Sequence, residues 1–399
     1  MAFNPGSLKL RYAAVAACGA SAFIDMYATQ PLLPELRHEF AASEAAVALT
    51  ISALTLACAL AAPFAGPLAD RLGRKRVIVV SIVVLGAVTL GAASATTLPA
   101  LVAWRFAQGL VMPGIFATTL AYIAEEFPRG VGGRAVGAYI GGNVFGGFFG
   151  RYASALVAEH FHWQSAFVLL GCLNFAGALL VWGALPRARN FRRSASLRAS
   201  LAAVGGFLRD PVLIAIFVVG GSVLFTLVAA FTFATFYLAG PPFDLSTAAL
   251  GNVFAVYLLG AVATPLSGRL IDRFGHRNAL FIALATSAAG LAITLLPSLA
   301  GVVAGLALMS TGVFCAQAAS QGFIGVYVGG SRSTAAALYL TVYYTGGGLG
   351  AIVPAYAWTH GGWGATVAEI AGVQVFAALL TAFVWPRRAA AAGGAVSTR

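Results

Sequence analysis

The stretch Gly66-Pro-Leu-Ala-Asp70-Arg71-Leu-Gly73-Arg74-Lys75-Arg76 separates two long apolar runs in the first quarter of the chain. Glycines at both ends permit a tight turn, and Asp70 is suited to cap a helix start and to pair with nearby arginines. A weaker copy follows about 200 residues later. Its matching residues are Gly268, Asp272, Arg273 and Gly275. The copy indicates that the chain has two related halves.

A second block repeats at nearly the same distance. Five residues of the first half recur 200 residues later: Tyr139, Gly146, Gly147, Gly150 and Trp163 return as Tyr339, Gly346, Gly347, Gly350 and Trp363. Two separate blocks at one offset predict an internal duplication of six-helix halves. This pattern is expected of a transporter with its site between the halves, near the membrane midplane.

The composition points to a membrane protein. Of 399 residues, 60% are hydrophobic and only 9% are charged, whereas soluble proteins carry roughly 25% charged residues. The formal net charge of +12 does not indicate nucleic acid, because the basic residues form no extended face with interleaved aromatics. The sequence has no Walker A loop, HExxH or CxxC, and its four cysteines lie in apolar runs. We therefore expect neither an enzyme nor a cofactor or metal site.

Twelve apolar runs are long enough to cross roughly 30 Å of hydrocarbon. They lie at about 11–33, 46–69, 77–95, 99–124, 134–157, 164–184, 211–238, 247–270, 278–296, 299–326, 334–357 and 364–385. An all-α protein of twelve spans in two pseudo-symmetric six-helix bundles follows.

The positive charges orient these spans. With the amino terminus inside, 21 of the 24 lysines and arginines fall on the inner side, the exceptions being Arg37, Arg105 and Arg151. This places both termini in the cytoplasm. The Arg-rich, amphipathic segment 185–210 then lies on the inner surface as a linker. It divides the chain into an N-terminal bundle, 1–184, and a C-terminal bundle with a short tail, 211–399.

The loop at Gly66–Arg76 resembles the loop signature of the major facilitator superfamily, and Gly268–Arg277 stands where that family has its second copy. The resemblance implies a cytoplasmic latch that steadies the outward-open state. Its residues would be Gly66, Asp70, Arg71, Gly73 and Arg74, with Asp272 and Arg273 in the second copy. The alternative interpretation is simple positive-inside charge.

Arg105-Phe-Ala-Gln108-Gly109 resembles a second signature of the superfamily, whose arginine is implicated in proton coupling in proton-coupled members. A buried arginine costs ~2.5–3.5 kcal/mol even on the lenient insertion scale, so Arg105 needs a partner or water. Asp25 lies at a similar predicted depth, and in the family the two spans both line the central cavity. We expect Asp25 to alternate between protonated and ionised forms; the alternative is a fixed ion pair.

The fifth span resembles the glycine-rich stretch that marks antiporters of the superfamily. Its glycines are Gly137, Gly141, Gly142, Gly146, Gly147 and Gly150. Small residues every three or four positions make a smooth face on which helices approach closely and slide. Where the antiporter pattern has a proline, this sequence has Gly142. Tight packing alone also explains the glycines.

Three stretches carry a closer resemblance: Tyr27-Ala-Thr-Gln30-Pro31-Leu-Leu-Pro34, the glycine run with Asn143 that ends at Arg151, and Leu338-Tyr339-Leu-Thr-Val-Tyr343-Tyr344. On these residues the chain resembles the drug:proton antiporter branch of the superfamily, and more closely inner-membrane proteins of the arabinose-efflux, YnfM-like type. The resemblance implies a proton-coupled antiporter in the bacterial inner membrane that exports small amphipathic molecules by alternating access, with protons as the coupling ion. We expect a monomer with a small-molecule substrate and the bilayer as partners. Proton-coupled uptake is the alternative, and a sensor or enzyme on the same fold is a third class.

Candidate substrate residues are polar or aromatic side chains within the spans. They are Tyr27, Gln30, Asn143, Arg151, Phe231, Tyr257, Gln317, Gln321, Tyr339 and Tyr343. An aromatic pocket with a few polar anchors suits amphipathic molecules. Two alternatives stay open, because phenylalanine in a membrane helix also packs or faces lipid and Arg151 is near enough to a helix end to reach the interface.

Overall fold

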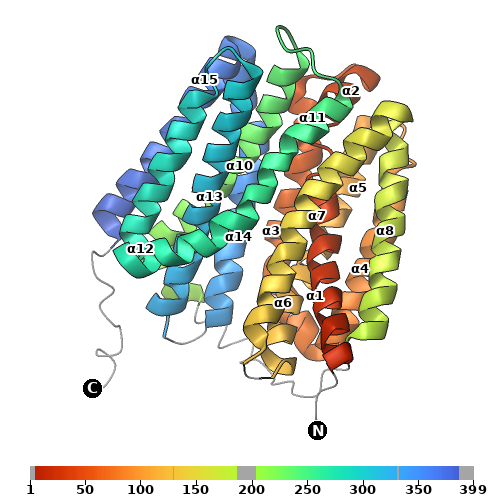
Figure 1. Ribbon diagram of the computed structural model, residues 1–399, viewed down its shortest axis with the longest axis vertical. Helices are drawn as coiled ribbons and strands as arrows, with labels where there is room; N and C mark the ends of the chain where they lie inside the picture. Colours follow the sequence, from red (N-terminus) through yellow and green to blue (C-terminus); the bar gives the residue numbers. More distant parts are fainter. Residues whose placement is uncertain (1–4, 129, 187–203, 330–331, 386–399) are drawn as a thin grey trace. The chain divides into compact units, whose positions relative to one another are not determined.

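The computed structural model describes residues 5–128, 130–186, 204–329 and 332–385, and every regular element within these ranges is a helix (Figure 1). Contacts divide it into two compact units. The first holds the described residues of Met1–Ser194 and Thr235–Leu258, and the second those of Ala195–Ala234 and Leu259–Arg399. Most of the predicted linker and the C-terminal tail lie outside the described residues.

The first unit contains the six spans that precede the linker and a short piece of the chain that follows it. Its elements are α1 (Pro5–Met26), α2 (Leu33–Glu39), α3 (Glu44–Leu72), α4 (Arg74–Ala92), α5 (Leu98–Val111), α6 (Pro113–Glu126), α7 (Gly132–His160), α8 (Trp163–Ala184), α11 (Thr247–Val253) and the 3₁₀ helix η1 (Phe254–Leu258).

The second unit contains the other long helices. They are α10 (Pro211–Ala239), whose last turn groups with the first unit, α12 (Leu259–Ile293), α13 (Leu299–Tyr327), α14 (Arg332–Ile352) and α15 (Pro354–Val384). Two of these helices each consist of two segments, because α12 breaks at Gly275 and α15 breaks at Gly362, both with positive φ. Conversely, α5 and α6 form one crossing interrupted at Pro113, and α11, η1 and the first part of α12 form another.

With these breaks taken into account, the chain makes the twelve predicted crossings. Seven of them among the described residues are long and apolar enough by length and composition alone; these are α3, α4, α5 with α6, α8, α10, α13 and α15. Equivalent helices of the two halves also start alike. The Thr97 hydroxyl accepts from the Ala100 amide at the start of α5, and the Ser298 hydroxyl accepts from the Gly301 amide at the start of α13.

The glycine runs bring two helix pairs into backbone contact. On α7, a Cβ at Gly146 would lie 2.7 Å from the Cα of Ala20 on α1. On α14, a Cβ at Gly346 would lie 2.0 Å from the carbonyl oxygen of Gly221 on α10. No side chain larger than hydrogen fits at either crossing. The duplication read from the sequence is therefore also a duplication of packing inside each unit.

The first span is shorter than predicted, because α1 ends at Met26 and not near residue 33. Residues 27–32 form turns closed by three-residue bonds, such as the Gln30 amide to the Tyr27 carbonyl at 3.0 Å. Pro31 and Pro34 follow at once, and the residue before a proline is disfavoured in the α conformation. The break puts Asp25 in the last turn of a helix, where the backbone carbonyls have no helical partners.

Candidate functional site

Asp25 lies at the broken end of α1 and is completely buried. Its carboxylate accepts two hydrogen bonds from neutral side chains: the Thr89 hydroxyl of α4 at 2.9 Å and the Asn174 amide of α8 at 2.5 Å. Among the described residues, no lysine or arginine side chain forms an ion pair with this carboxylate. Asp25 is thus a buried acid whose direct partners carry no charge.

Arg105 of α5 is also completely buried and binds the same helix end. Its guanidinium donates to the backbone carbonyls of Asp25 and Met26, both at 2.8 Å, and to that of Thr50 at 3.1 Å. The last carbonyls of a helix carry a partial negative charge and need donors. The charge of Arg105 is therefore met by the end of α1, and its contact with Asp25 is to the backbone and not to the carboxylate.

Two neutral side chains connect Arg105 to the Asp25 carboxylate. Arg105 donates to the Gln108 carbonyl oxygen at 2.7 Å, and the Gln108 amide donates to the Thr89 hydroxyl at 2.7 Å. Thr89 in turn donates to Asp25. Every donor in this chain points from Arg105 towards Asp25, so a change of charge at Asp25 alters each hydrogen bond of the series.

Arg151 of α7 lies in a second buried site of the first unit and is 1% exposed. Its Nε donates to the Gln30 side-chain oxygen at 2.7 Å, and its Nη1 donates to the Gly147 carbonyl. Three rings surround the guanidinium, with centroids 4.6 Å away for Tyr27, 4.6 Å for Tyr257 and 5.0 Å for Phe254. We call this group the Arg151 cage. Arg151 does not reach the interface along its side chain, so it belongs to the interior of the unit.

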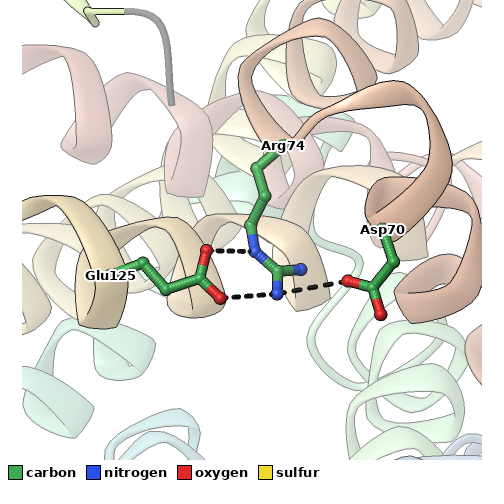
Figure 2. Close-up of polar contacts among 3 residues, drawn as sticks. All are labelled: Asp70, Arg74 and Glu125. Carbon is green, nitrogen blue, oxygen red and sulfur yellow. Dashed lines mark hydrogen bonds and ion pairs between the residues drawn. The ribbon is translucent and has the colours of Figure 1, made fainter. Parts of the chain in front are cut away.

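The loop between α3 and α4 holds a three-residue ion cluster (Figure 2). Arg74 makes two hydrogen bonds of 2.7 Å to the carboxylate of Glu125 on α6 and pairs with Asp70 at 3.3 Å. Gly73 permits this turn with φ +88°, which a side chain would strain. Arg71 is exposed and Gly66 faces open space. The sequence predicted that Asp70 pairs with a nearby arginine, and the structure shows Arg74 in that position. Glu125 was not predicted.

The second copy of this loop keeps the backbone and loses the ion cluster. Gly275 has φ +76°, close to Gly73, but Asp272 and Arg273 are exposed. His276 stands where the first copy has Arg74. Burial lowers the pKa of His276, and its ring packs edge-on against Phe323 at 5.7 Å. The surroundings of His276 therefore favour its neutral form.

The remaining predicted residues are spread over both units. Gly137 and Gly141 face open space on α7, Gly142 and Gly150 press on the α1 backbone, and Asn143 is half-buried. In the second unit, Tyr339 shares a hydrogen bond with Ser320 at 3.0 Å and stacks on Tyr343 at 5.7 Å. The others differ in burial: Phe231 is fully buried, Gln317 half-buried and Gln321 exposed.

The pattern of the Major Facilitator Superfamily matches residues 15–251 and 222–399, that is, both halves of the chain. The chain belongs to the major facilitator superfamily. As a member it is a membrane transporter of small molecules and not an enzyme.

Relatives of this superfamily member span most of its length. The uncharacterized MFS-type transporter YybF of Bacillus subtilis is 29% identical over 382 residues, covering 96% of this chain and 94% of that protein. The inner membrane transport protein YnfM of Escherichia coli is 31% identical over 369 residues, covering 92% and 88%. The predicted resemblance to this type is thereby confirmed.

Solved structures share the major facilitator fold at low identity. A bacterial homologue of the human lysosomal transporter Spinster, inward-facing and occupied, aligns with TM-score 0.78 and 17% identity over 96% of this chain and 97% of that one. A D-xylose-proton symporter aligns with TM-score 0.77 and 16% identity over 95% and 98%. At such identities the likeness is one of fold alone.

Sequence reasoning missed the neutral partners of the charged groups. Thr89, Asn174 and Gln108 surround the Asp25 carboxylate or lead to it, and Phe254 completes the Arg151 cage. Gln108 stood in the quoted motif and was passed over. The other three are ordinary residues of apolar runs, and the only available signal was their polarity or aromaticity at a helical position.

Proposed function

We propose that this transporter is a proton-coupled antiporter that exports small amphipathic organic molecules across the bacterial inner membrane, with Asp25 as the proton carrier. The observation that carries the proposal is the Asp25 carboxylate: it is fully buried, and its side-chain partners in the described part of the chain are the neutral Thr89 and Asn174. A carboxylate fixed by direct ion pairs stays charged, whereas one held by neutral donors is free to change its protonation state.

The surroundings of Asp25 offer partners to both protonation states. The ionised carboxylate accepts from Thr89 and Asn174. The carbonyl oxygen of Asn174 is buried without a partner. Rotation of this amide would turn its acceptor towards Asp25, where a neutral acid needs one. Burial penalises the charged form and the two hydrogen bonds favour it, so a modest change at the site shifts the balance.

Arg105 has a positioning role in this proposal. By holding the carbonyls of Asp25 and Met26 it fixes the end of α1, and through Gln108 and Thr89 it senses the charge of Asp25. Substrate binding that moves the end of α1 would therefore change the proton affinity of Asp25. This gives a physical route for coupling without direct contact between substrate and carboxylate.

The proposed direction of transport is based on the glycine run of α7. The glycine run of α7 favours antiport, because its resemblance is to the antiporters of the superfamily. Proton-coupled uptake on the same fold remains the second candidate. The proposal further includes the two latches as devices of alternating access, both termini in the cytoplasm, a monomer, and no bound cofactor.

The test uses the full chain in proteoliposomes that contain the pH dye pyranine. An inward gradient of substrate is applied from a panel of ethidium, octanoate, naphthalene-2-carboxylate and L-arabinose. An antiporter exchanges entering substrate for lumenal protons and makes the lumen alkaline, whereas a symporter makes it acidic. We expect an alkaline response for at least one amphipathic compound and none with Asp25→Asn.

A matched control makes the same chemical change elsewhere. Asp244 is exposed in the turn after α10 and has φ +46°, which asparagine also tolerates. Asp244→Asn should respond like the wild type. An unchanged response of a folded Asp25→Asn protein would overturn the proton assignment. Because neutral octanoic and naphthoic acid cross a bilayer and release protons in the lumen, responses are taken relative to protein-free liposomes. An acidic response of the wild type beyond that background would replace antiport by symport.

A further inference from the structure

Arg151 is a buried cation without a counter-ion among the described residues. It is 1% exposed, and no carboxylate of the described residues forms an ion pair with it. Its polar partners are the Gln30 side chain, the Gly147 carbonyl and the Tyr257 hydroxyl, all neutral. An uncompensated charge inside a membrane helix is costly and is retained where a ligand or a relay requires it.

The nearby acids are occupied elsewhere. Asp25 precedes Tyr27 of the cage by two residues, but its carboxylate points to Thr89 and Asn174. Glu159 lies two turns further along α7 and accepts from the Ala248 amide at 2.9 Å. The three rings of the cage attract a cation through their faces but supply no negative charge. Within the described part of the chain, no carboxylate therefore balances the charge of Arg151, and a bound anion would supply that balance.

One row of residues on α7 packs against α11 and η1, the segment that covers Arg151. This row consists of every fourth residue of α7: Gly147, Arg151, Ala155 and Glu159. Against it lie residues of α11 and η1 that repeat every three, namely Tyr257, Phe254, Gly251 and Ala248. A 3₁₀ segment within a span has weaker hydrogen-bond geometry than an α-helix and often marks a hinge. Phe254 and Tyr257 are therefore carried by the part of this crossing that is easiest to displace.

Resting on the proposed transport function, we infer that Arg151 is the binding residue for a cargo molecule that carries one carboxylate on an aromatic or aliphatic body. Gln30 occupies Nε and fixes the plane of the guanidinium. Gly147 takes one hydrogen of Nη1. The second hydrogen of Nη1 and those of Nη2 form the end of the guanidinium, which suits a bidentate contact with a carboxylate. In this structure the Tyr257 side chain hydrogen-bonds to Arg151, and the cargo carboxylate replaces that hydrogen bond.

The charge expected of the cargo follows from the side chains around Arg151. Among the described residues, the Arg151 cage contains no second lysine or arginine. Arg105 is unsuited to share a ligand, because its donors are engaged by three backbone carbonyls and Gln108. One guanidinium balances one negative charge, which disfavours phosphorylated cargo. The faces of Tyr27, Phe254 and Tyr257 suit an apolar body beside the carboxylate.

Calorimetry on the purified full chain in detergent tests this inference by binding alone. Three acids are compared with their uncharged amides of the same shape: benzoate, octanoate and naphthalene-2-carboxylate. We expect the wild type to bind at least one acid tenfold or more tightly than its amide. Arg151→Gln should reduce this ratio to about one, and Arg151→Lys, which keeps the charge without the fork, should retain part of it.

A second variant separates binding from a purely structural role. Tyr257→Phe keeps Arg151 and removes the hydroxyl that competes for it, so the acid preference should persist or increase. If no acid binds the wild type more tightly than its amide, or if Arg151→Gln keeps the preference, the inference is overturned. Should Arg151→Gln fail to fold, a Tyr257→Phe protein that loses the preference overturns it as well.

The inference and the proposed function fail in different ways. Acid binding that depends on Arg151, without any pyranine response, would sustain the anion site and remove proton coupling. A pyranine response to ethidium or L-arabinose alone, with no acid preference in calorimetry, would sustain coupled transport and remove the anion site.

Discussion

α1 and α10 are the same helix of the two halves, yet only α1 breaks. Both pack against a glycine run: Gly146 meets Ala20 of α1, and Gly346 meets Gly221 of α10. α1 nevertheless ends at Met26, whereas α10 continues unbroken to Ala239. In the alignment set by these contacts, Pro31 and Pro34 of the first half correspond to Thr232 and Thr235 of the second. Threonine continues a helix, and proline does not.

The completely buried charged residues Asp25 and Arg105 lie in the half whose first helix is broken, at the end of α1. Arg105 donates to the carbonyls at the C-terminal end of α1. The equivalent residue on α13 is Leu306. In that half α10 continues as a helix, so it has no carbonyls at this level that need a donor. Asp25 itself corresponds to Thr226, whose hydroxyl simply bonds back to Ser222 at 3.0 Å. The duplication thus kept the contacts that pack helices and confined the ionisable network to one half.

The largest expected loss of stability comes from replacing Arg105 of the first half by leucine, the equivalent residue of the second half. Arg105→Leu leaves three backbone carbonyls and Gln108 without a donor, at ~1–3 kcal/mol each. We expect the variant to lose at least about 3 kcal/mol or to unfold during purification, as followed by thermal unfolding in detergent. Leu306→Met is the control and should stay within ~1.5 kcal/mol of the wild type. A normal melting temperature for Arg105→Leu would refute this account of the helix end.

A second prediction addresses what the halves share. A Cβ at Gly150 would lie 2.0 Å from the Ile24 carbonyl oxygen, and one at Gly346 equally close to Gly221. Gly150→Ala and Gly346→Ala should each destabilise by ~1–3 kcal/mol through overpacking. Gly141 faces open space, so Gly141→Ala should be neutral or stabilising by up to ~1 kcal/mol. Equal melting temperatures for all three would mean that the helix pairs adjust freely.

The two latch loops provide a third, smaller comparison. Arg74 and Glu125 make two short charge-assisted hydrogen bonds in a partly exposed site. A double-mutant cycle with Arg74→Gln and Glu125→Gln should give a coupling of about 1 kcal/mol, reduced by solvent. The same cycle with Asp272→Asn and His276→Gln should give less than ~0.5 kcal/mol, because the second loop lacks a fixed ion pair. Similar couplings in both loops would contradict the asymmetry.

The sequence predicted what rests on local patterns. The twelve crossings follow from apolar length, and the glycine turn and the pairing of Asp70 with a nearby arginine follow from residues within one short segment. Contacts between distant residues were beyond it: Glu125 lies 51 positions from Arg74, and Asn174 lies 149 from Asp25. The end of α1 was missed for another reason. Pro31 and Pro34 were visible, but the apolar run around them continues, and apolar length outweighed the proline signal.

The segment that exists only because α1 breaks also carries an unusual acid. Glu35 lies on α2 outside the spans, where α10 has Phe236 in the alignment of the halves. Partial burial, together with the charges of Glu39 and Glu159, raises the pKa of Glu35 from 4.5 to about 7. The folded protein therefore binds this proton more tightly than the unfolded chain does.

Stability should fall as pH rises between about 4.5 and 7, because Glu35 loses its proton in the unfolded chain first, and it should be flat in this respect above pH 7. Glu35→Gln removes this part of the slope, so its melting temperature should exceed that of the wild type at pH 8 by more than at pH 5. The effect is the smallest of the four, since the side chain is partly exposed. Glu39→Gln should reproduce a fraction of it, and Asp244→Asn, an exposed acid in the other half of the sequence, none. A slope unchanged by Glu35→Gln would show that Glu35 on α2 is solvated enough to be ionised without cost. The break in α1 would then affect ionisable groups only at the end of α1 itself, where Arg105 binds the backbone carbonyls.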